Sequence, residues 1–109
     1  MKDTYYFIAI GGIGMSGLAK YLVEAGFNVL GSDIKRNRNI EELEKLGAKI
    51  FIGHDAENLP EKCFVVASTA IKEDNPELMK AKSLGLDILH RSDLLARINE
   101  GLVGEKKKY

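Results

Sequence analysis

Three glycines near the amino end of the chain have the spacing of a phosphate-binding loop. Gly12, Gly14 and Gly17 form the pattern G-x-G-x-x-G, directly after an apolar run and directly before apolar residues at helical spacing. In such loops the first glycine permits a tight turn, the second lets backbone approach a phosphate, and the third allows close packing of helix on strand. Because the first N–H groups of a helix lack partners and its dipole is positive there, we predict that the segment Gly11–Gly17 holds a diphosphate.

An aspartate follows the glycine loop at the distance expected for a ribose contact. Asp33 lies 33 − 12 = 21 residues after Gly12, and an acidic residue about 20 residues on accepts hydrogen bonds from ribose hydroxyls in dinucleotide-binding folds. A turn or capping aspartate is the alternative. Lys35, Arg36 and Arg38 follow; they could meet a further phosphate, but we expect ordinary surface cations.

Other polar residues come after the later apolar runs. Ser68–Ile71 combines small side chains with accessible backbone, which can line a base or ribose, although ordinary strand termination is an alternative. His54 lies in a polar loop, where a lone histidine is usually a surface residue, and we expect His90 to be structural. The chain shows no nucleophile triad, no paired-carboxylate site, no metal cluster and no G-x-x-x-x-G-K-[ST] phosphate loop.

The chain alternates between short apolar runs and segments whose apolar residues recur at helical spacing, and these elements must position the residues named above. This alternation predicts an α/β fold, a doubly wound Rossmann-like parallel sheet with helices on both faces and strand order 3-2-1-4-5. Ligands of such sheets bind where the winding reverses, here between the first and fourth strands. The predicted strands are Tyr5–Ile10, Asn28–Gly31, Lys49–Ile52, Cys63–Ala67 and Asp87–Leu89.

Four helices are predicted between and after these strands. Apolar residues at helical spacing place the first over Met15–Val23 and the second around Ile40, Leu43 and Leu46. Asn75 should cap the third, with Pro76 at its first position, and Ser92 should cap the last. The expected apolar face of the third helix consists of Leu78, Met79, Ala81 and Leu84, and residues 53–60 are expected to form a polar loop.

Composition excludes several classes of function. The 109 residues suffice for one domain, and 16 basic against 16 acidic residues argue against a nucleic-acid partner. The single cysteine, Cys63, excludes an internal disulfide and a CxxC zinc site, so we expect a buried strand cysteine in a reducing, cytoplasmic protein. No apolar run approaches the ~20 residues of a membrane helix, and Lys106–Lys108 reads as a solvated tail.

Four segments together resemble one family. Ile8–Gly17, Gly31-Ser32-Asp33, Ile52–Asn58 and Ser68–Glu77 are similar to the N-terminal domain of the alanine-adding Mur ligases, the UDP-N-acetylmuramate–L-alanine ligases of peptidoglycan synthesis. The resemblance ends near Leu95. The ligases that recycle murein tripeptide depart from the Gly-Gly-Ile-Gly-Met-Ser form and rank lower.

The resemblance implies a substrate and a set of contacts. In that family the N-terminal domain binds the UDP part of UDP-N-acetylmuramate, while a central ATPase domain and a C-terminal domain use ATP and Mg²⁺ to form the amide bond with alanine. Asp33 would bind the ribose hydroxyls, and His54 would border the uridine. The diphosphate contacts implied are Gly11, Gly12, Ile13, Gly14, Met15 and Ser16, and the other uridine neighbours are Ser68, Thr69, Ala70 and Ile71.

The sequence ends at Tyr109, near where the family's central domain should begin. We therefore expect a UDP-binding domain over residues 1–99 and a linker over residues 100–109, with no catalytic residue, metal site or cofactor of its own. The main alternative is a stand-alone NAD(H)-binding regulatory domain of the potassium-transport type, which shares the glycine pattern and the acidic residue. A dehydrogenase cofactor half and a pure interaction module are weaker alternatives.

Overall fold

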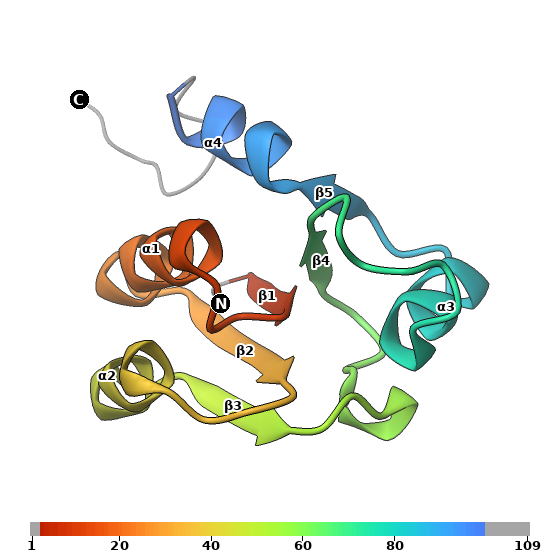
Figure 1. The fold of residues 1–109 in the computed structure, drawn as a ribbon. Helices are drawn as coiled ribbons and strands as arrows, with labels where there is room; N and C mark the ends of the chain where they lie inside the picture. Colours follow the sequence, from red (N-terminus) through yellow and green to blue (C-terminus); the bar gives the residue numbers. More distant parts are fainter. Residues whose placement is uncertain (1–2, 100–109) are drawn as a thin grey trace.

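The computed structural model describes residues 3–99, so the predicted linker at 100–109 and the run Lys106–Lys108 lie outside the described residues. Five parallel strands form one sheet in the order β3-β2-β1-β4-β5, as the sequence predicts (Figure 1). β1 pairs with β2 on one side and with β4 on the other, which places the reversal of winding between β1 and β4. The strands are β1 (Thr4–Ile8), β2 (Asn28–Asp33), β3 (Lys49–Ile52), β4 (Phe64–Ala67) and β5 (Ile88–His90).

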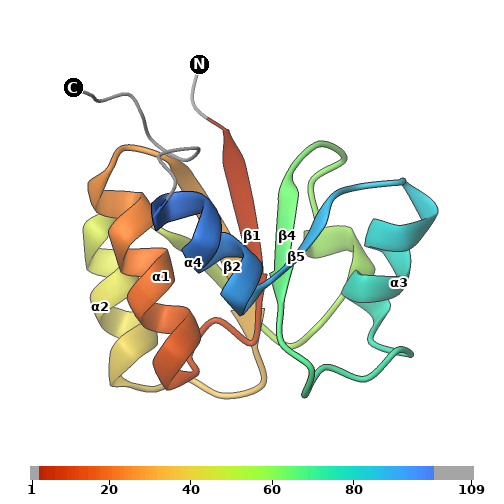
Figure 2. The same cartoon turned by 90° about the horizontal axis from the view of Figure 1, so that it is seen from above.

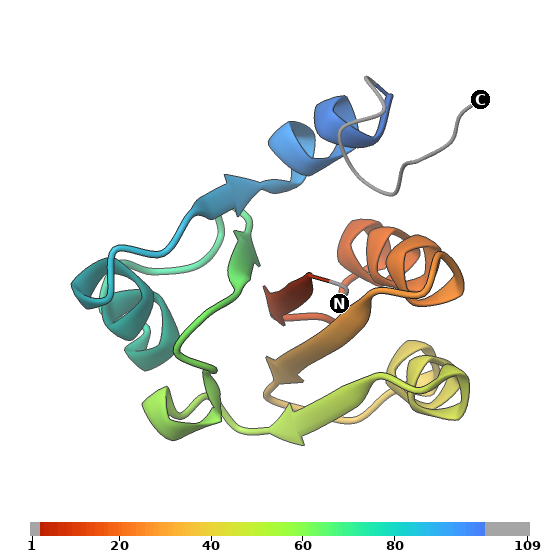
Figure 3. The ribbon, with the colours of Figure 1, turned by 180° about the vertical axis from the view of Figure 1, so that it is seen from behind.

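Helices cover both faces of the sheet. α1 (Ile13–Glu24), α2 (Arg38–Leu46) and α4 (Arg91–Asn99) lie on one face, and the short η1 (Ala56–Asn58) and α3 (Pro76–Ser83) lie on the other (Figures 2 and 3). The two faces bury separate apolar clusters because side chains alternate along each strand. In β1, Tyr5 and Phe7 pack under α1, α2 and α4, whereas Tyr6 and Ile8 pack under α3 and η1.

All predicted strand bounds hold to within two residues, and the two largest differences have a physical cause. The first strand ends at Ile8 rather than Ile10, because Ala9 takes a left-handed conformation with φ of 66° and turns the chain into the glycine loop. The second strand runs on past Gly31 to Asp33, since polar Ser32 is fully buried and remains paired in the sheet.

The third helix begins as its sequence predicts. The side chain of Asn75 accepts hydrogen bonds from the backbone N–H groups of Glu77 and Leu78, with Pro76 at the first position. Its predicted apolar face is only half correct: Leu78 and Ala81 are buried, but Met79 and Leu84 are 55% and 42% exposed. The helix is short and covers the sheet with one narrow stripe.

One other local prediction was wrong, and one needs a detail added. Ser92 lies inside α4 and does not cap it; the carboxylate of Asp93 instead accepts a hydrogen bond of 3.0 Å from the N–H of His90. The loop predicted at residues 53–60 contains η1, whose first turn is closed by the Asp55 side chain accepting from the N–H of Glu57. Within residues 3–99, no helix is long and apolar enough to cross a membrane.

Candidate functional site

The glycine loop joins β1 to α1 at the carboxyl edge of the sheet. After the left-handed Ala9, the N–H of Ile10 donates to the carbonyl of Ser32 at 2.9 Å and keeps the loop on β2. Gly12 is the N-cap residue of α1 with φ of −65° and ψ of 152°. The prediction that Gly12 supplies the tight turn is therefore wrong, because any residue can adopt its conformation and the turn is made at Ala9.

Gly31 and Gly11, and not the predicted Gly17, are the glycines at which the backbone packs closely. Gly17 has open space where a side chain would begin, so the expected close packing of helix on strand at this position is wrong. A Cβ on Gly31 would lie 2.7 Å from the carbonyl oxygen of Phe7 and 2.7 Å from Ile10 Cδ1. A Cβ on Gly11 would lie 2.8 Å from Asp33 Oδ2. The loop therefore approaches β2 most closely, and no single-sequence motif marks Gly31 for that role.

The amino end of α1 differs from those of α2, η1 and α3 in having no side-chain cap. Its N-cap is Gly12, its first turn has no acidic residue, and the first N–H bonded within the turn is that of Ser16, which donates to Gly12 at 2.8 Å. α2, η1 and α3 are each capped by an Asn or Asp side chain and carry a glutamate in the first turn. α1 thus keeps free the N–H groups and positive dipole end that bind an anion.

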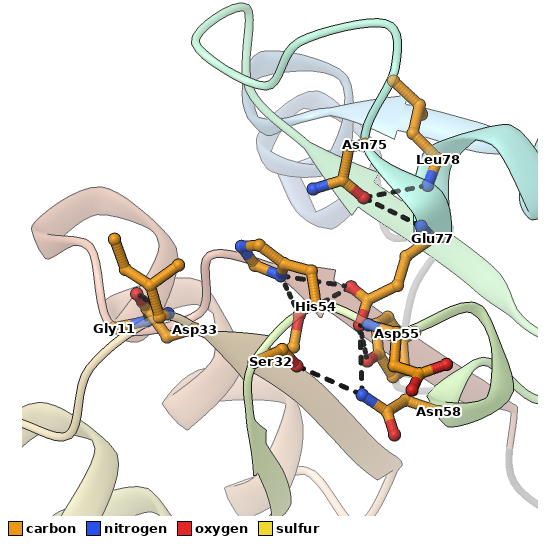
Figure 4. A network of polar contacts seen from close by, with 12 residues as sticks. Gly11, Ser32, Asp33, His54, Asp55, Asn58, Asn75, Glu77 and Leu78 are labelled. Atoms are coloured by element: carbon orange, nitrogen blue, oxygen red, sulfur yellow. Dashed lines mark hydrogen bonds and ion pairs between the residues drawn. The ribbon is translucent and has the colours of Figure 1, made fainter.

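Asp33 supports the glycine loop from β2. Its Oδ2 accepts a hydrogen bond of 2.8 Å from the N–H of Gly11, and its Oδ1 accepts one of 2.8 Å from the N–H of Ile34. The side-chain amides of Asn37 and Asn39 donate to the carbonyl of Gly11 at 3.1 and 3.2 Å (Figure 4 labels Gly11 and Asp33). The predicted ribose-binding carboxylate therefore also fixes the backbone of the predicted diphosphate loop.

An arginine that the sequence did not single out lies against the loop. Arg91 is exposed at the start of α4, and its Cδ and Nη1 are 2.9 Å from where a Cβ on Gly14 would be. The fold thereby brings a cation from the end of β5 to the first turn of α1. The cations that the sequence did single out behave as expected for surface residues, since both Nη atoms of Arg36 bind Glu44, at 2.8 and 2.9 Å.

His54 belongs to a buried polar network at the ends of β1, β2 and β3. Its Nδ1 is 2.7 Å from Ser32 Oγ, which in turn donates to Glu77 Oε1 at 2.6 Å. Gly53 precedes it with φ of 101°, a conformation that favours glycine and turns His54 back over β2. Figure 4 shows His54 between Asp33 on one side and Glu77 on the other.

Glu77 lies at the centre of this network and was missed by the sequence reasoning. Its side chain is fully buried, and its Oε2 accepts hydrogen bonds from the Tyr6 hydroxyl at 2.7 Å, the Asp55 N–H at 3.1 Å and Asn58 Nδ2 at 3.3 Å. Burial, and then the hydrogen bond to Glu77, raise the pKa of Tyr6, which keeps its hydroxyl a donor. The hydroxyl of a buried tyrosine needs a hydrogen-bond partner. Tyr6 in the apolar first strand was therefore the signal in the sequence that a buried acceptor such as Glu77 exists.

The Ser32, His54 and Glu77 trio is not a nucleophile triad. Ser32 is fully buried and gives its proton to the carboxylate rather than to the histidine. Activation of a serine requires an accessible hydroxyl whose proton goes to the base.

The segment Ser68–Ile71 follows β4 at the same edge of the sheet. The Ser68 hydroxyl accepts from the N–H of Ala70 at 3.2 Å, and the Ser68 carbonyl accepts from the N–H of Ile71 at 3.2 Å. Thr69 and Ala70 are exposed, while Ile71 packs partly against the cluster under α3. The turn leaves these residues accessible beside β1, and within residues 3–99 no hydrogen bond joins them to His54 or to the glycine loop.

Cys63 lies at the opposite edge of the sheet. It is half-buried just before β4 and lines a hollow of about 330 Å³ together with Asp3, Lys62 and Asp87. Burial raises the pKa of its thiol to about 11, which suits an unreactive structural cysteine. Among residues 3–99, no group of three or more His, Cys, Asp or Glu side chains could hold a metal ion.

Comparison with known proteins identifies related sequences along nearly the whole chain. The family described as "Mur ligase family, catalytic domain" matches residues 4–101. A UDP-N-acetylmuramate–L-alanine ligase from Hydrogenobaculum sp. (strain Y04AAS1) is 52% identical over 101 residues, covering 90% of this chain and 22% of the relative. The chain thus spans about a fifth of the length of the curated relatives it matches.

Solved structures agree with this relationship. The crystal structure of UDP-N-acetylmuramate–alanine ligase from Thermotoga maritima superposes with a TM-score of 0.77 at 35% identity, covering 91% of this chain and 22% of that one. The UDP-N-acetylmuramate:L-alanyl-gamma-D-glutamyl-meso-diaminopimelate ligase from Neisseria meningitides gives 0.78 at 29% identity, covering 89% and 31%. Backbone similarity therefore does not distinguish these two ligases, whereas sequence identity favours the first.

Proposed function

Because this chain belongs to the Mur ligase family, we propose that it is the N-terminal, substrate-holding domain of a UDP-N-acetylmuramate–L-alanine ligase and binds the UDP part of that substrate. One observation carries the proposal. Cap residues are described for α1, α2, η1 and α3, and of these α1 is the one whose first turn has no side-chain cap and no acidic residue. A diphosphate supplies the negative charge and the hydrogen-bond acceptors that this end of the helix lacks.

The proposed contacts follow the carboxyl edge of the sheet. The backbone of Gly11, Gly12, Ile13, Gly14, Met15 and Ser16 would face the diphosphate, with Arg91 beside Gly14 as a further cation. Asp33 would accept from ribose hydroxyls with the lone pairs that its hydrogen bonds from Gly11 and Ile34 leave free. His54 and the segment Ser68–Ile71 would border the uridine from β3 and β4, on the two sides of β1 and β2.

The chemical step would belong to other parts of a longer ligase. The relatives are about five times as long as the matched segment, and the chain contains no G-x-x-x-x-G-K-[ST] loop for ATP. ATP and Mg²⁺ would supply carboxylate activation there, and the residues described here would hold the UDP end of the substrate in place. We propose that this domain binds its substrate in the cytoplasm, where nucleotide-linked substrates are made.

Two alternatives rank below this proposal. The ligase that adds a murein peptide has the same fold, but the relative of that kind is 29% identical, against 52% for an alanine-adding relative. A stand-alone NAD(H)-binding regulatory domain shares the glycine pattern, but the Mur ligase match extends over residues 4–101 and includes segments outside that pattern.

Ligand-dependent thermal stabilisation tests the proposal on the 109-residue chain. A ligand that binds only the native state stabilises it by RT ln(1 + [L]/Kd), about 2.7 kcal/mol at one hundred times Kd. We expect stabilisation by UDP-N-acetylmuramate and UDP, weaker stabilisation by uridine, and none by NAD. Stabilisation by NAD without stabilisation by UDP would overturn the assignment. No amide formation is expected from this chain with ATP and alanine.

A charge substitution tests the position of the diphosphate. Ile13 is the first residue of α1 and is 91% exposed, so Ile13→Glu should preserve the fold while placing a carboxylate where the phosphates would bind. We expect UDP affinity to fall at least about fivefold, since like charges ~4 Å apart repel by about 1 kcal/mol even in water. Met79→Glu, at a 55% exposed site on α3, is the matched control and should bind UDP normally. Equal losses in both variants would place the ligand elsewhere.

A further inference from the structure

The buried carboxylate of Glu77 is connected to a ring nitrogen of His54 through one hydroxyl. Ser32 Oγ has a single proton, and at 2.6 Å it donates that proton to Glu77 Oε1. The oxygen can then only accept from His54 Nδ1 at 2.7 Å, so Nδ1 carries the ring proton. Nδ1 is also 3.5 Å from Glu77 Oε1. This distance favours a proton on Nδ1 as well, because a carboxylate oxygen can only accept a hydrogen bond.

The other contacts hold the carboxylate in its acceptor role. Tyr6, Asp55 and Asn58 all donate to Oε2, so both oxygens of the fully buried side chain receive hydrogen bonds. The network ties Glu77 to β1, β2 and the loop after β3 at once. Neither Glu77 nor Ser32 can rotate without leaving buried donors unpaired.

The orientation of the ring follows from this arrangement. With Nδ1 turned inward, Nε2 lies on the far side of the ring from Glu77 (Figure 4), and the histidine side chain is 18% exposed. We propose that Glu77 is a positioning residue, which acts through Ser32 to present His54 Nε2 as a hydrogen-bond acceptor to a donor group of a bound nucleoside. The inference rests on the proposed function for the identity of the ligand, but the ring state it predicts exists without ligand.

The donor group on the nucleoside has two sources, a ribose hydroxyl and the imide N–H of uracil. Both would give a hydrogen bond to a neutral ring nitrogen, and they are separated by analogues. 2′-Deoxy-UDP lacks one hydroxyl and N3-methyl-UDP lacks the imide proton. The analogue that loses affinity for the wild-type protein, but not for a His54→Ala variant, identifies the partner of Nε2.

Nitrogen-15 spectroscopy of the histidine rings tests the positioning directly. The chain has two histidines, and a His90→Gln variant leaves His54 as the only signal. We expect the ligand-free protein near neutral pH to show the tautomer with the proton on Nδ1. Ser32→Ala should shift the signal toward the ordinary mixture of tautomers and weaken UDP binding about three- to tenfold, the equivalent of one hydrogen bond. A wild-type signal with a proton on Nε2, whether alone or together with one on Nδ1, would overturn the proposal.

Tyr6→Phe is the matched control because it removes another hydrogen bond from the same carboxylate without touching His54. It should lower the unfolding temperature but leave the His54 signal and UDP affinity unchanged. Equal losses of UDP affinity in Tyr6→Phe and Ser32→Ala would reduce Glu77 to a structural role and contradict the proposal. Glu77→Gln should act like Ser32→Ala, and Ser32→Ala alone decides the question if Glu77→Gln does not fold. Absence of UDP binding with the expected tautomer would refute the proposed function and leave the positioning intact.

Discussion

At the scale of single residues, Gly31 in β2 and Gly17 in α1 have opposite surroundings. A methyl group on Gly31 would lie 2.7 Å from backbone, and backbone cannot move aside cheaply. We expect Gly31→Ala to destabilise the fold by about 1–3 kcal/mol, the usual range for overpacking. Gly17→Ala meets open space inside a helix and should stabilise the fold by ~1 kcal/mol. Urea denaturation of both variants measures the difference, and the same sign for both would contradict the packing described for the loop.

The proposed contact of Arg91 with the diphosphate follows from its position in the fold and not from any sequence motif. Its guanidinium group lies at Gly14, in the first turn of α1. We expect Arg91→Ala to weaken UDP binding about five- to tenfold, as the loss of one solvent-exposed charge-assisted hydrogen bond would. Uridine lacks the phosphates and should bind equally to both proteins. Arg91→Lys should recover part of the loss, and Lys82→Ala on α3 serves as a charge control.

Calorimetric titrations at two salt concentrations check this prediction. A phosphate contact is screened by salt, so the difference between wild-type protein and Arg91→Ala should shrink as ionic strength rises. An equal loss for UDP and uridine would show that Arg91 supports the fold of the loop instead.

The residues of the candidate site differ in how well sequence could predict them. The glycine pattern and Asp33 stand at spacings that carry a physical meaning, and the structure brings Gly11 and Asp33 into contact. Glu77 could not be found in this way, because a glutamate after Asn75 and Pro76 looks like an ordinary exposed residue of a first helical turn. Its burial depends on Ser32, 45 residues away, and on a tyrosine in the first strand.

At the scale of elements, two asparagine caps have different consequences. Asn75 caps α3 only, whereas Asn37 caps α2 through Oδ1 and also donates from Nδ2 to the carbonyl of Gly11. Loss of either cap should cost about 1 kcal/mol. Asn37→Asp keeps the acceptor but loses the donor, so it should preserve α2 and loosen the glycine loop.

Amide hydrogen exchange of Gly11 distinguishes these effects. The N–H of Gly11 is held by Asp33, and its exchange should be faster in Asn37→Asp and Asn37→Ala. Asn75→Ala should lose stability to the same extent as Asn37→Ala without this local change. Unchanged exchange in Asn37→Asp would mean that Asn39, which also donates to Gly11, suffices to hold the loop.

Element order and sheet topology were predictable because they rest on periodic patterns. Buried parallel strands appear as apolar runs and amphipathic helices as spaced apolar residues, so the order 3-2-1-4-5 follows from handedness rules. The turn at Ala9 was not predictable, since alanine carries no signal for a positive φ. Likewise, the end of β2 depended on Ser32, whose polarity suggests a strand end unless its partner Glu77 is known.

At the scale of the whole molecule, all the proposed contacts lie at one edge of the sheet. The carboxyl ends of β1, β2, β3, β4 and β5, with the residues that follow them, supply Gly12, Asp33, His54, Ser68 and Arg91 in turn. The amino edge carries Cys63 and a separate hollow. Substitutions at the amino edge should therefore change global stability without changing UDP affinity, which separates the two properties in one small domain.

Alkaline unfolding tests the amino edge through Cys63. Burial raises the pKa of this thiol from its ordinary value of 9.0 to about 11, so the folded protein holds the proton more tightly than the unfolded chain. The stabilising contribution is complete below pH 9 and is lost as pH rises toward 11, because the unfolded thiol ionises first. We expect the free energy of unfolding, measured in urea, to fall over this interval, and to fall less steeply in Cys63→Ala. Tyr6, whose pKa is also raised by burial from its ordinary value of 10.0, adds a loss of the same sign that begins near pH 10. An identical decline in wild-type protein and Cys63→Ala would show that the thiol is not buried as described.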